Sequence, residues 1–488
     1  MSNFDPNKTA LRKYWAFPKP KDQREYEVKD ASLNGAEIIV NQQKFYDEYH
    51  VSGHKVFDEA YFPNLMLAVP IDGRTTPDGK QVYTTEEHRV RRVGYAIQQM
   101  ACTALMAHLF GNDVEFTDSK VALDKVNEES LTRYKQIWLD KNMETAIYRF
   151  GYSLFSMADS AIVFSFVDDE LHWRVWSRLD GDDVYGLKDP YGNTHTIVRK
   201  YMRDDEKGDT VEHLDVLDSQ SLTTYTGKDG KYTQIFSAPH GFRFLPAYYY
   251  MRRAGAVWTE GQVSIDTIEL MMSLLSEDNR TKSKGKYFIA TDNPDDVETF
   301  TLGSADVCVS TVNSEMKLIH GADISTSFKF EFDTHKEVLY NTLGVVFPEV
   351  KSSGDMPTGS MKLLFYPSER MVTNLAHEFN EPLNKVAQLF RKCLQMEYPE
   401  EGFGELSLNA WIKVFTPQDD SARVNMVVQA KGAGVISEDT AIEEIPFSKK
   451  NEKARLGRER EEAAHELRAL ERLRVPVEPV NVNEGVTA

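Results

Sequence analysis

Two amphipathic helical segments that enclose a block of short strands constrain the fold of this chain more than any other feature. The first runs from Trp258 to about Ser283, and its apolar residues lie on one stripe, at Ile265, Ile268, Met272 and Leu275. The second ends at Pro348 and has a common apolar face, made of Phe332, Leu339, Leu343 and Val346. Between them, residues 285–327 contain short β-type runs, of which 287–290, 307–309 and 316–319 are the clearest. We therefore expect a helix, a small strand unit and a second helix, with the first stripe covered by a neighbouring copy of the chain.

The start of the first helix has a recognisable local signal. Thr259 and Gln262 have the spacing of a capping box, in which each side chain satisfies a free main-chain N–H of the first turn. This predicts a helix that begins at this point.

The residues before this block predict a mixed helical and strand region. Apolar residues repeat at helical spacing over residues 90–109, and a second helix is expected over 131–155. Beyond Asp159 the pattern changes to short β-type runs with turn signals at 188–192 and 228–231, which indicates an antiparallel meander. An aromatic strand, 247–251, follows.

The residues after the block predict a loop, a long helix and a helical end. Residues 348–360, PEVKSSGDMPTGS, form a breaker segment of Pro, Gly and Ser. One long helix is expected over 361–396, with kinks or breaks at Pro367 and Pro382. Alternating apolar residues over 406–415 predict a strand. The last helical section, 425–474, is interrupted at Gly432, Gly434 and Pro446.

The composition is that of a folded protein, with 41% hydrophobic and 27% charged residues. The longest apolar stretch, 100–110, is far shorter than the roughly 18 residues that span a bilayer, and the first residues lack the pattern of a signal peptide. Three cysteines at wide spacing, Cys102, Cys308 and Cys393, favour reduced, buried thiols in a cytoplasmic setting over disulfides or a zinc site.

The charge balance argues against tight binding of nucleic acid. The chain has 57 basic and 76 acidic residues, a net charge of −19, which gives no general attraction for a phosphate backbone. Three lysines at the end of the first helix, Lys282, Lys284 and Lys286, either stabilise the helix dipole or contact DNA if a ring brings copies of them together.

No pattern of catalytic, cofactor or metal-binding residues occurs in the sequence. The nearest approach to a phosphate loop, residues 354–362, lacks a lysine directly after its second glycine and follows a helix instead of a strand. Dinucleotide-binding, zinc-protease and serine-nucleophile motifs are absent from the sequence. The acidic run Asp180–Asp183 does not fit a calcium loop and is expected to be a solvated turn. We expect no enzyme activity and no cofactor.

Four motifs, in this order along the chain, resemble the portal protein of tailed bacteriophages, in the branch typical of long non-contractile tails. They are His240-Gly-Phe with Leu245-Pro246, Thr358-Gly-Ser-Met-Lys362, Phe415-Thr-Pro-Gln-Asp419, and the segment Gly434 to Pro446 with the charged helix after it. The resemblance extends over residues 159–474, and residues 1–150 match only loosely.

The resemblance implies an α+β portal fold with a mixed α/β wing, a two-helix stem, a small α/β clip, a long kinked helix and an α-helical crown. The parts are the wing at 1–255, stem helix 1 at 256–284, the clip at 285–327, stem helix 2 at 328–347, the tunnel loop at 348–360, the long helix and wing completion at 361–427, the crown at 428–474 and a disordered tail at 475–488. The tunnel loop would meet DNA through Lys351, Ser352, Ser353, Gly354, Asp355 and Met356, and Lys282, Lys284 and Lys286 would be further residues of the channel wall.

The resemblance also implies a virion protein, not an enzyme. A ring of about twelve subunits would stand at one capsid vertex, after assembly in the host cytoplasm, and double-stranded DNA would pass through it without being read. The implied partners are the terminase large subunit, a head-tail adaptor, and the major capsid and scaffolding proteins, with no membrane. The alternative is another ring-forming connector or virion structural protein without a DNA channel. A packaging nuclease or ATPase is a third reading, which lacks the necessary residues.

Overall fold

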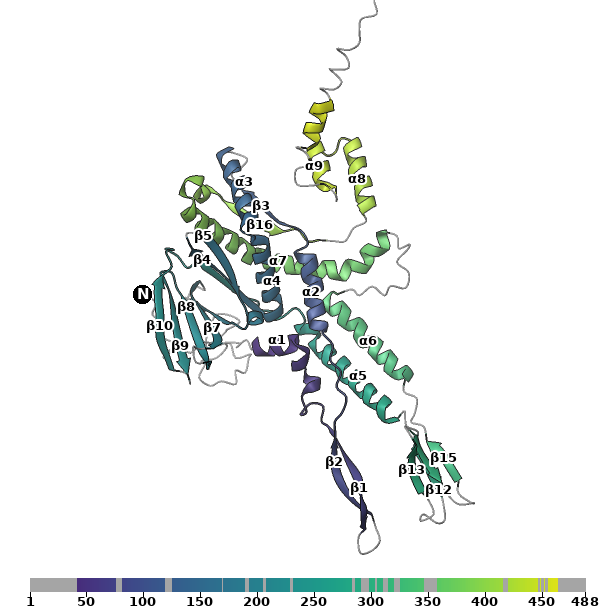
Figure 1. Ribbon diagram of the computed structural model, residues 1–488. Helices are drawn as coiled ribbons and strands as arrows, with labels where there is room; N and C mark the ends of the chain where they lie inside the picture. Colours follow the sequence, from purple (N-terminus) through teal and green to yellow (C-terminus); the bar gives the residue numbers. More distant parts are fainter. Residues whose placement is uncertain are drawn as a thin grey trace, which may run out of the picture. The chain divides into compact units, whose positions relative to one another are not determined.

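The structure is a computed structural model in which most residues between 42 and 463 can be described (Figure 1). The described residues are 42–75, 81–118, 125–168, 170–188, 193–204, 208–228, 231–282, 286–290, 298–302, 305–309, 315–319, 325–345, 358–415, 420–445, 448, 452 and 455–463. They fall into two compact units, one within Met1–Glu349 and Phe365–Phe415 and one within Val350–Leu364 and Thr416–Ala488. We describe each unit by itself.

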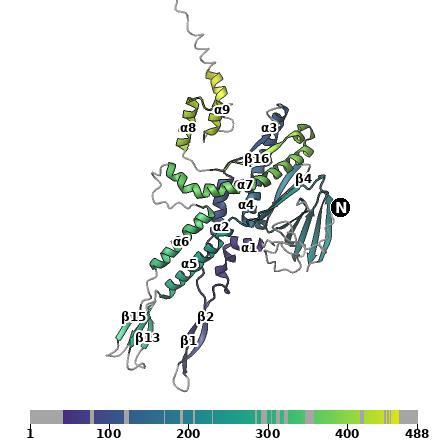
Figure 2. The same cartoon turned by 180° about the vertical axis from the view of Figure 1, so that it is seen from behind.

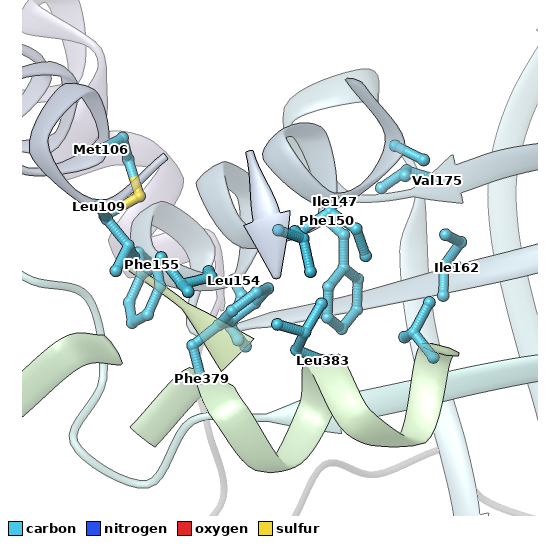
Figure 3. Packing of buried hydrophobic residues seen from close by; sticks show 14 of the residues in the cluster. Met106, Leu109, Ile147, Phe150, Leu154, Phe155, Ile162, Val175, Phe379 and Leu383 are labelled. Atoms are coloured by element: carbon cyan, nitrogen blue, oxygen red, sulfur yellow. The ribbon is translucent and has the colours of Figure 1, made fainter. Parts of the chain in front are cut away.

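The core of the larger unit lies around the long helix α7 (Thr358–Glu397), from Phe365 onward. Its buried face repeats every three or four residues, at Val372, Leu375, Phe379, Leu383, Val386 and Phe390. Figure 3 shows Phe379 and Leu383 beside Phe150 and Leu154 of α4 (Met143–Met157). The rings of Phe379 and Phe150 have centroids 5.9 Å apart. Since a fully buried side chain of this size contributes about 1.5–3 kcal/mol, this face alone can hold α7 in place.

Helix α7 is continuous through both of its prolines, although we expected kinks or breaks there. Neither Pro367 nor Pro382 ends the helix, so the prediction of breaks is wrong. Each proline removes one main-chain donor from the helix, and the burial of the face from Val372 to Phe390 outweighs that loss.

Two helices occupy the region where we expected one over 131–155. Helix α3 (Lys125–Asp140) ends before α4 begins, and Asn142 between them has a left-handed backbone with φ of 54°. Asparagine tolerates this conformation better than most residues. The indole Nε1 of Trp138 donates to Glu144 Oε1 at 2.9 Å across the break, which fixes the turn.

The strands after α4 form two antiparallel sheets. The first has the order β11-β4-β5 and consists of β4 (Asp159–Val167), β5 (Glu170–Trp176) and β11 (Ala247–Met251). The second is a meander with the order β10-β9-β8-β7-β6, made of β6 (Asp183–Lys188), β7 (Thr194–Asp204), β8 (Thr210–Leu217), β9 (Ser221–Lys228) and β10 (Lys231–Pro239). The predicted meander and the predicted strand 247–251 are confirmed.

We expected the acidic run Asp180–Asp183 to be a solvated turn, and this is confirmed for the exposed Asp180 but wrong for Asp182. Asp182 is buried, and its Oδ1 lies 2.8 Å from Nη2 of Arg199 on β7. Burial raises the pKa of Asp182, and the ion pair with Arg199 opposes that rise. This carboxylate is therefore part of the packing of the sheet.

Three further groups of elements complete the larger unit. Helix α1 (Gln42–Tyr49) is followed by the short 3-10 turns η1 (Val51–Gly53) and η2 (Lys55–Phe57), and then by the antiparallel hairpin β1 (Leu65–Thr75) and β2 (Gln81–His88). Helix α2 (Ile97–Leu109) is buried against α4. Strands β3 (Val114–Asp118) and β16 (Leu408–Ile412) pair antiparallel, and the latter confirms the strand expected within 406–415.

The helix, strand unit and helix arrangement predicted from the sequence is present. Helices α5 (Gln262–Lys282) and α6 (Ser325–Leu343) lie side by side in both views and lead to the strand unit (Figures 1 and 2). The unit contains two antiparallel pairs, β12 (Lys286–Ala290) with β15 (Glu315–Ile319) and β13 (Glu298–Leu302) with β14 (Ala305–Val309). Three of these strands were predicted and β13 was missed. The clip, residues 285–327, was expected to contain both helix and strand. Before Ser325, where α6 begins, all described residues of this range are in strands.

Both ends of this helix pair differ from expectation. Thr259 lies in the 3-10 turn η4 (Thr259–Gly261), and no side-chain cap forms, so the capping box is wrong. Helix α6 ends at Leu343, five residues before Pro348, because Gly344 takes a left-handed backbone with φ of 62° and Val345 N–H donates to Tyr340 O at 3.2 Å. This is the bond pattern of a Schellman cap, for which glycine is the preferred residue.

The first half of the apolar stripe of α5 is covered by the same chain. Ile265 and Ile268 are buried in one core cluster with Leu339 and Leu343 of α6, whereas Met272 and Leu275 are only partly buried. The expectation that a neighbouring copy covers the stripe is therefore wrong for Ile265 and Ile268 and stays a prediction for the other two. The packing of α5 on α6 explains why both helices have a regular apolar repeat.

The smaller unit is helical in its described residues from 420 onward. It contains α8 (Asp420–Gly432), α9 (Glu438–Glu444) and a helical stretch at 455–463. Gly434 has a φ of 70° in the turn between α8 and α9, and Ser437 Oγ accepts from Thr440 N at 3.1 Å to cap α9. The expected interruption at Gly432 and Gly434 is confirmed, while Pro446 and the tail 475–488 lie outside the described residues.

Candidate functional site

The residues that the sequence analysis placed at a DNA channel lie almost entirely outside the described residues. Lys351, Ser352, Ser353, Gly354, Asp355 and Met356 all belong to this group, as does Lys284. Lys282 closes α5 and Lys286 opens β12, and only their backbone is described. The structure describes in detail the contacts of α5 and Trp258 with residues 48–57 and 89–96, which we call the root of the helix pair.

An extended segment, residues 89–96, runs along α5 and is the main feature of this root. We expected a helix from Val90, but α2 begins only at Ile97. Every second amide of this segment donates to a side chain of α5. Arg91 N donates to Glu277 Oε2 at 3.1 Å, Val93 N donates to Ser273 Oγ at 2.8 Å, and Tyr95 N donates to Glu269 Oε1 at 2.8 Å. The segment therefore uses helix side chains where a strand would use a neighbouring strand.

The geometry of this contact follows from the rise of the two structures. Two residues of extended chain advance about 6.7 Å and four residues of helix advance about 6 Å, so every second amide meets every fourth helix residue. Gly94 lies where the segment is tightest, since a Cβ there would stand 2.7 Å from side-chain atoms of both Val51 and Phe57. The sequence signal that we missed is the polar stripe of α5 at Glu269, Ser273 and Glu277. These side chains are buried and accept hydrogen bonds from the segment.

His54 joins the segment before the hairpin to the same stripe of α5. Its Nδ1 lies 2.7 Å from Glu269 Oε1, and its Nε2 lies 2.9 Å from the main-chain oxygen of Glu48. Both ring nitrogens face acceptors, an arrangement that favours the doubly protonated imidazolium. Burial lowers the pKa of His54, but the hydrogen bond and the charge of Glu269 outweigh this effect and raise the pKa above its ordinary value.

A second set of contacts ties α1 and η2 to the first turns of α5. The indole Nε1 of Trp258 donates to Glu48 Oε2 at 3.1 Å. Lys55 Nζ lies 2.6 Å from Asp266 Oδ2, and Gln262 Nε2 donates to the other oxygen of Asp266 at 2.8 Å. Burial raises the pKa of Glu48, and the bond from Trp258 opposes that rise. The buried carboxylates of this root are thus held by specific donors.

These groups form a joint and contain no arrangement for catalysis. No group of three or more metal-ligating side chains is found in the part of the chain that the structure describes. The thiols of Cys102 and Cys393 are free and buried, as expected, and burial raises the pKa of Cys102 to about 12, so neither favours a reactive thiolate. The side chain of Cys308 lies outside the described residues. Among the described helices, none is long and apolar enough to cross a membrane.

The outer faces of the helix pair expose large apolar side chains. Val263 and Leu274 of α5 are 75% and 50% exposed, and Phe330 and Val338 of α6 are 75% and 52% exposed. Large exposed apolar side chains are typical of protein contact sites where they gather into a patch.

The described residues of this region thus form a long helix pair that ends in a strand unit and has buried polar contacts at its base. A family model described as "Phage portal protein, SPP1 Gp6-like" matches residues 34–466. Because this match covers most of the chain, the chain belongs to that family of phage portal proteins. Among curated proteins, no match to the sequence is found.

Membership of this family confirms the resemblance seen in the sequence. The family is structural and non-enzymatic, its members are virion proteins of bacteriophages, and its known role is in DNA packaging. The family also implies an oligomeric ring that associates with the capsid and with DNA.

Proposed function

We propose that this chain forms a closed ring of about twelve copies at one capsid vertex, and that double-stranded DNA enters and leaves the head through its centre. One observation carries this proposal: α5 and α6 lie side by side and end in a small strand unit, in a chain of the portal family. A conduit of this kind needs elongated elements that can stand next to their copies around an axis. The net charge of −19 per copy favours weak contact between DNA and the wall.

The parts of the portal are assigned as follows in this proposal. Helices α5 and α6 form the stem, residues 285–327 the clip and 348–360 the tunnel loop, while residues 1–255 and 361–427 form the wing and 428–474 the crown. The cap at Gly344 supports this assignment of the loop, because it ends α6 before the loop, and α7 begins at Thr358 within it. Lys351 and the five residues after it would meet DNA, and Lys282, Lys284 and Lys286 would lie on the channel wall.

The proposed partners follow from the same assignment. The terminase large subunit would dock at the clip during packaging, and a head-tail adaptor would replace it afterwards. Major capsid and scaffolding proteins would surround the wing while the particle assembles in the host cytoplasm. DNA would be held briefly and without regard to its sequence, because its contacts would be to phosphates.

Electron microscopy of the purified full-length chain tests the proposal. We expect closed rings with an open central channel, and a mass by native mass spectrometry that corresponds to about twelve copies. A ring whose centre is filled by protein would favour the alternative, a connector without a DNA channel. A chain that stays monomeric at micromolar concentration across several salt concentrations would contradict both.

A further inference from the structure

The root of the stem has an exposed basic edge on the extended segment 89–96. The side chains of Val90 and Arg92 point inward: Val90 is buried with Val56 and Phe62, and Arg92 donates to Phe62 O at 2.8 Å. Since alternate side chains of an extended chain lie on opposite sides, Arg89 and Arg91 point outward together, and both are exposed. Within the described part of the chain, neither guanidinium has an acidic partner.

The outer face of α6 is acidic. Glu331, Asp333 and Glu337 are all exposed, and none of them pairs with a basic side chain among the described residues. Lys329 is the exposed base of this helix, one turn nearer its start. The same outer face carries the exposed Phe330 and Val338, so apolar and acidic groups alternate along it. It lies opposite the face that packs on α5 through Leu339 and Leu343.

The basic edge and the acidic face lie on different sides of the stem. The segment 89–96 binds α5 through Glu269, Ser273 and Glu277, while Ile265 and Ile268 of α5 are buried with Leu339 and Leu343 of α6. At 100° per residue, these two faces of α5 are about a third of a turn apart. A ring needs such an arrangement, because its interfaces join two different surfaces of the same chain.

We propose that Arg89 and Arg91 of one copy contact Glu331 and Glu337 on α6 of the next copy, with Phe330 and Val338 covered in the same interface. The inference rests on the proposed ring and assigns the surfaces that build it. Opposite charges attract across this head-to-tail contact. Because the two surfaces lie on different sides of the stem, each copy can contact one neighbour through each surface, and the contact repeats until the ring closes.

Charge reversal on each side, in the full-length chain, tests this pairing. One variant carries Arg89→Glu and Arg91→Glu, and the other carries Glu331→Lys and Glu337→Lys. We expect each alone to lose the ring at about 0.15 M salt, measured by native mass spectrometry, because like charges then meet at every interface. Combined in one chain, the four substitutions should restore the ring. An equimolar mixture of the two variants should form rings that contain both in equal number.

Matched reversals outside the stem serve as controls. Arg149→Glu on α4 and Glu129→Lys on α3 change exposed charges of the same kind and should leave assembly intact. Circular dichroism and the melting temperature check that each variant is folded. If the wild type and both reversal variants all form normal rings, this inference is wrong and the portal proposal still holds. A monomeric wild type would overturn the proposed function, and this pairing with it.

Discussion

The side-chain amide of Asn384 on α7 forms both hydrogen bonds of a strand partner with Ala410 on β16. Its Nδ2 donates to Ala410 O at 2.7 Å, and its Oδ1 accepts from Ala410 N at 2.7 Å. Asn380, one turn earlier, accepts from Ile412 N at 3.3 Å. Strand β16 pairs with β3 along its other edge, so these two asparagines close the edge that would otherwise lack partners. The contact also ties the strand that follows α7 back to that helix.

Replacing Asn384 with leucine should destabilise the larger unit. The substitution leaves the N–H and C=O of Ala410 without partners in a buried place, and each unmade bond costs about 1–3 kcal/mol. We expect the free energy of unfolding to fall by about 2–4 kcal/mol, measured by urea titration with both proteins in the same oligomeric state. The control is Asn374→Leu on the exposed face of α7, which should change it by less than about 0.5 kcal/mol. Equal effects of the two substitutions would contradict the role of Asn384.

Replacing His54 with glutamine should change the pH dependence of stability. The pKa of His54 is raised in the folded protein, so its contribution is complete below the ordinary pKa of about 6.5 and is lost as the pH rises through the folded value. The difference in unfolding free energy between wild type and His54→Gln should therefore be largest near about pH 6 and shrink above it. A difference that stays constant from about pH 6 to pH 9 would contradict a raised pKa of His54 in the fold.

Removing the hydroxyl of Ser273 should loosen the segment 89–96. Ser273→Ala takes away the acceptor of the Val93 amide, whose loss costs about 1–3 kcal/mol locally. Hydrogen exchange followed by mass spectrometry should show exchange of the peptide that covers 89–96 faster by about tenfold or more. Ser264→Ala on another side of α5 is the control and should leave that peptide unchanged. Unaltered exchange in Ser273→Ala would mean that the other two bonds suffice.

The tunnel loop should matter through its length more than through its single lysine. One exposed lysine per copy gives weak attraction to phosphates that salt screens, so Lys351→Ala should leave rings intact and reduce DNA retention only modestly. Removing residues 352–355 should widen the narrowest point of the channel and lower the DNA content of filled heads more strongly. Heads assembled with each variant and assayed for DNA separate the two cases. Normal filling with the shortened loop would exclude it as the constriction.

Periodic patterns in the sequence predicted the elements whose burial is decided nearby. The apolar repeats of α5 and α6, the meander β6–β10 and the strand β11 were all correct, because apolar spacing and turn signals are local properties of the sequence. The family motifs were likewise visible in the sequence. The channel residues from Lys351 to Met356 remain predictions.

Three features depend on tertiary structure: the extended conformation of residues 89–96, the continuity of α7 through its prolines, and the identity of the residues that pack on α5. Residues 90–96 are extended because side chains of Glu269, Ser273 and Glu277, far along the chain, accept their amide hydrogens, and a local pattern cannot contain that information. Helix α7 passes through Pro367 and Pro382 because the burial of its later turns exceeds the loss of two main-chain bonds. An apolar stripe shows that a face is covered, but only the folded chain shows what covers it.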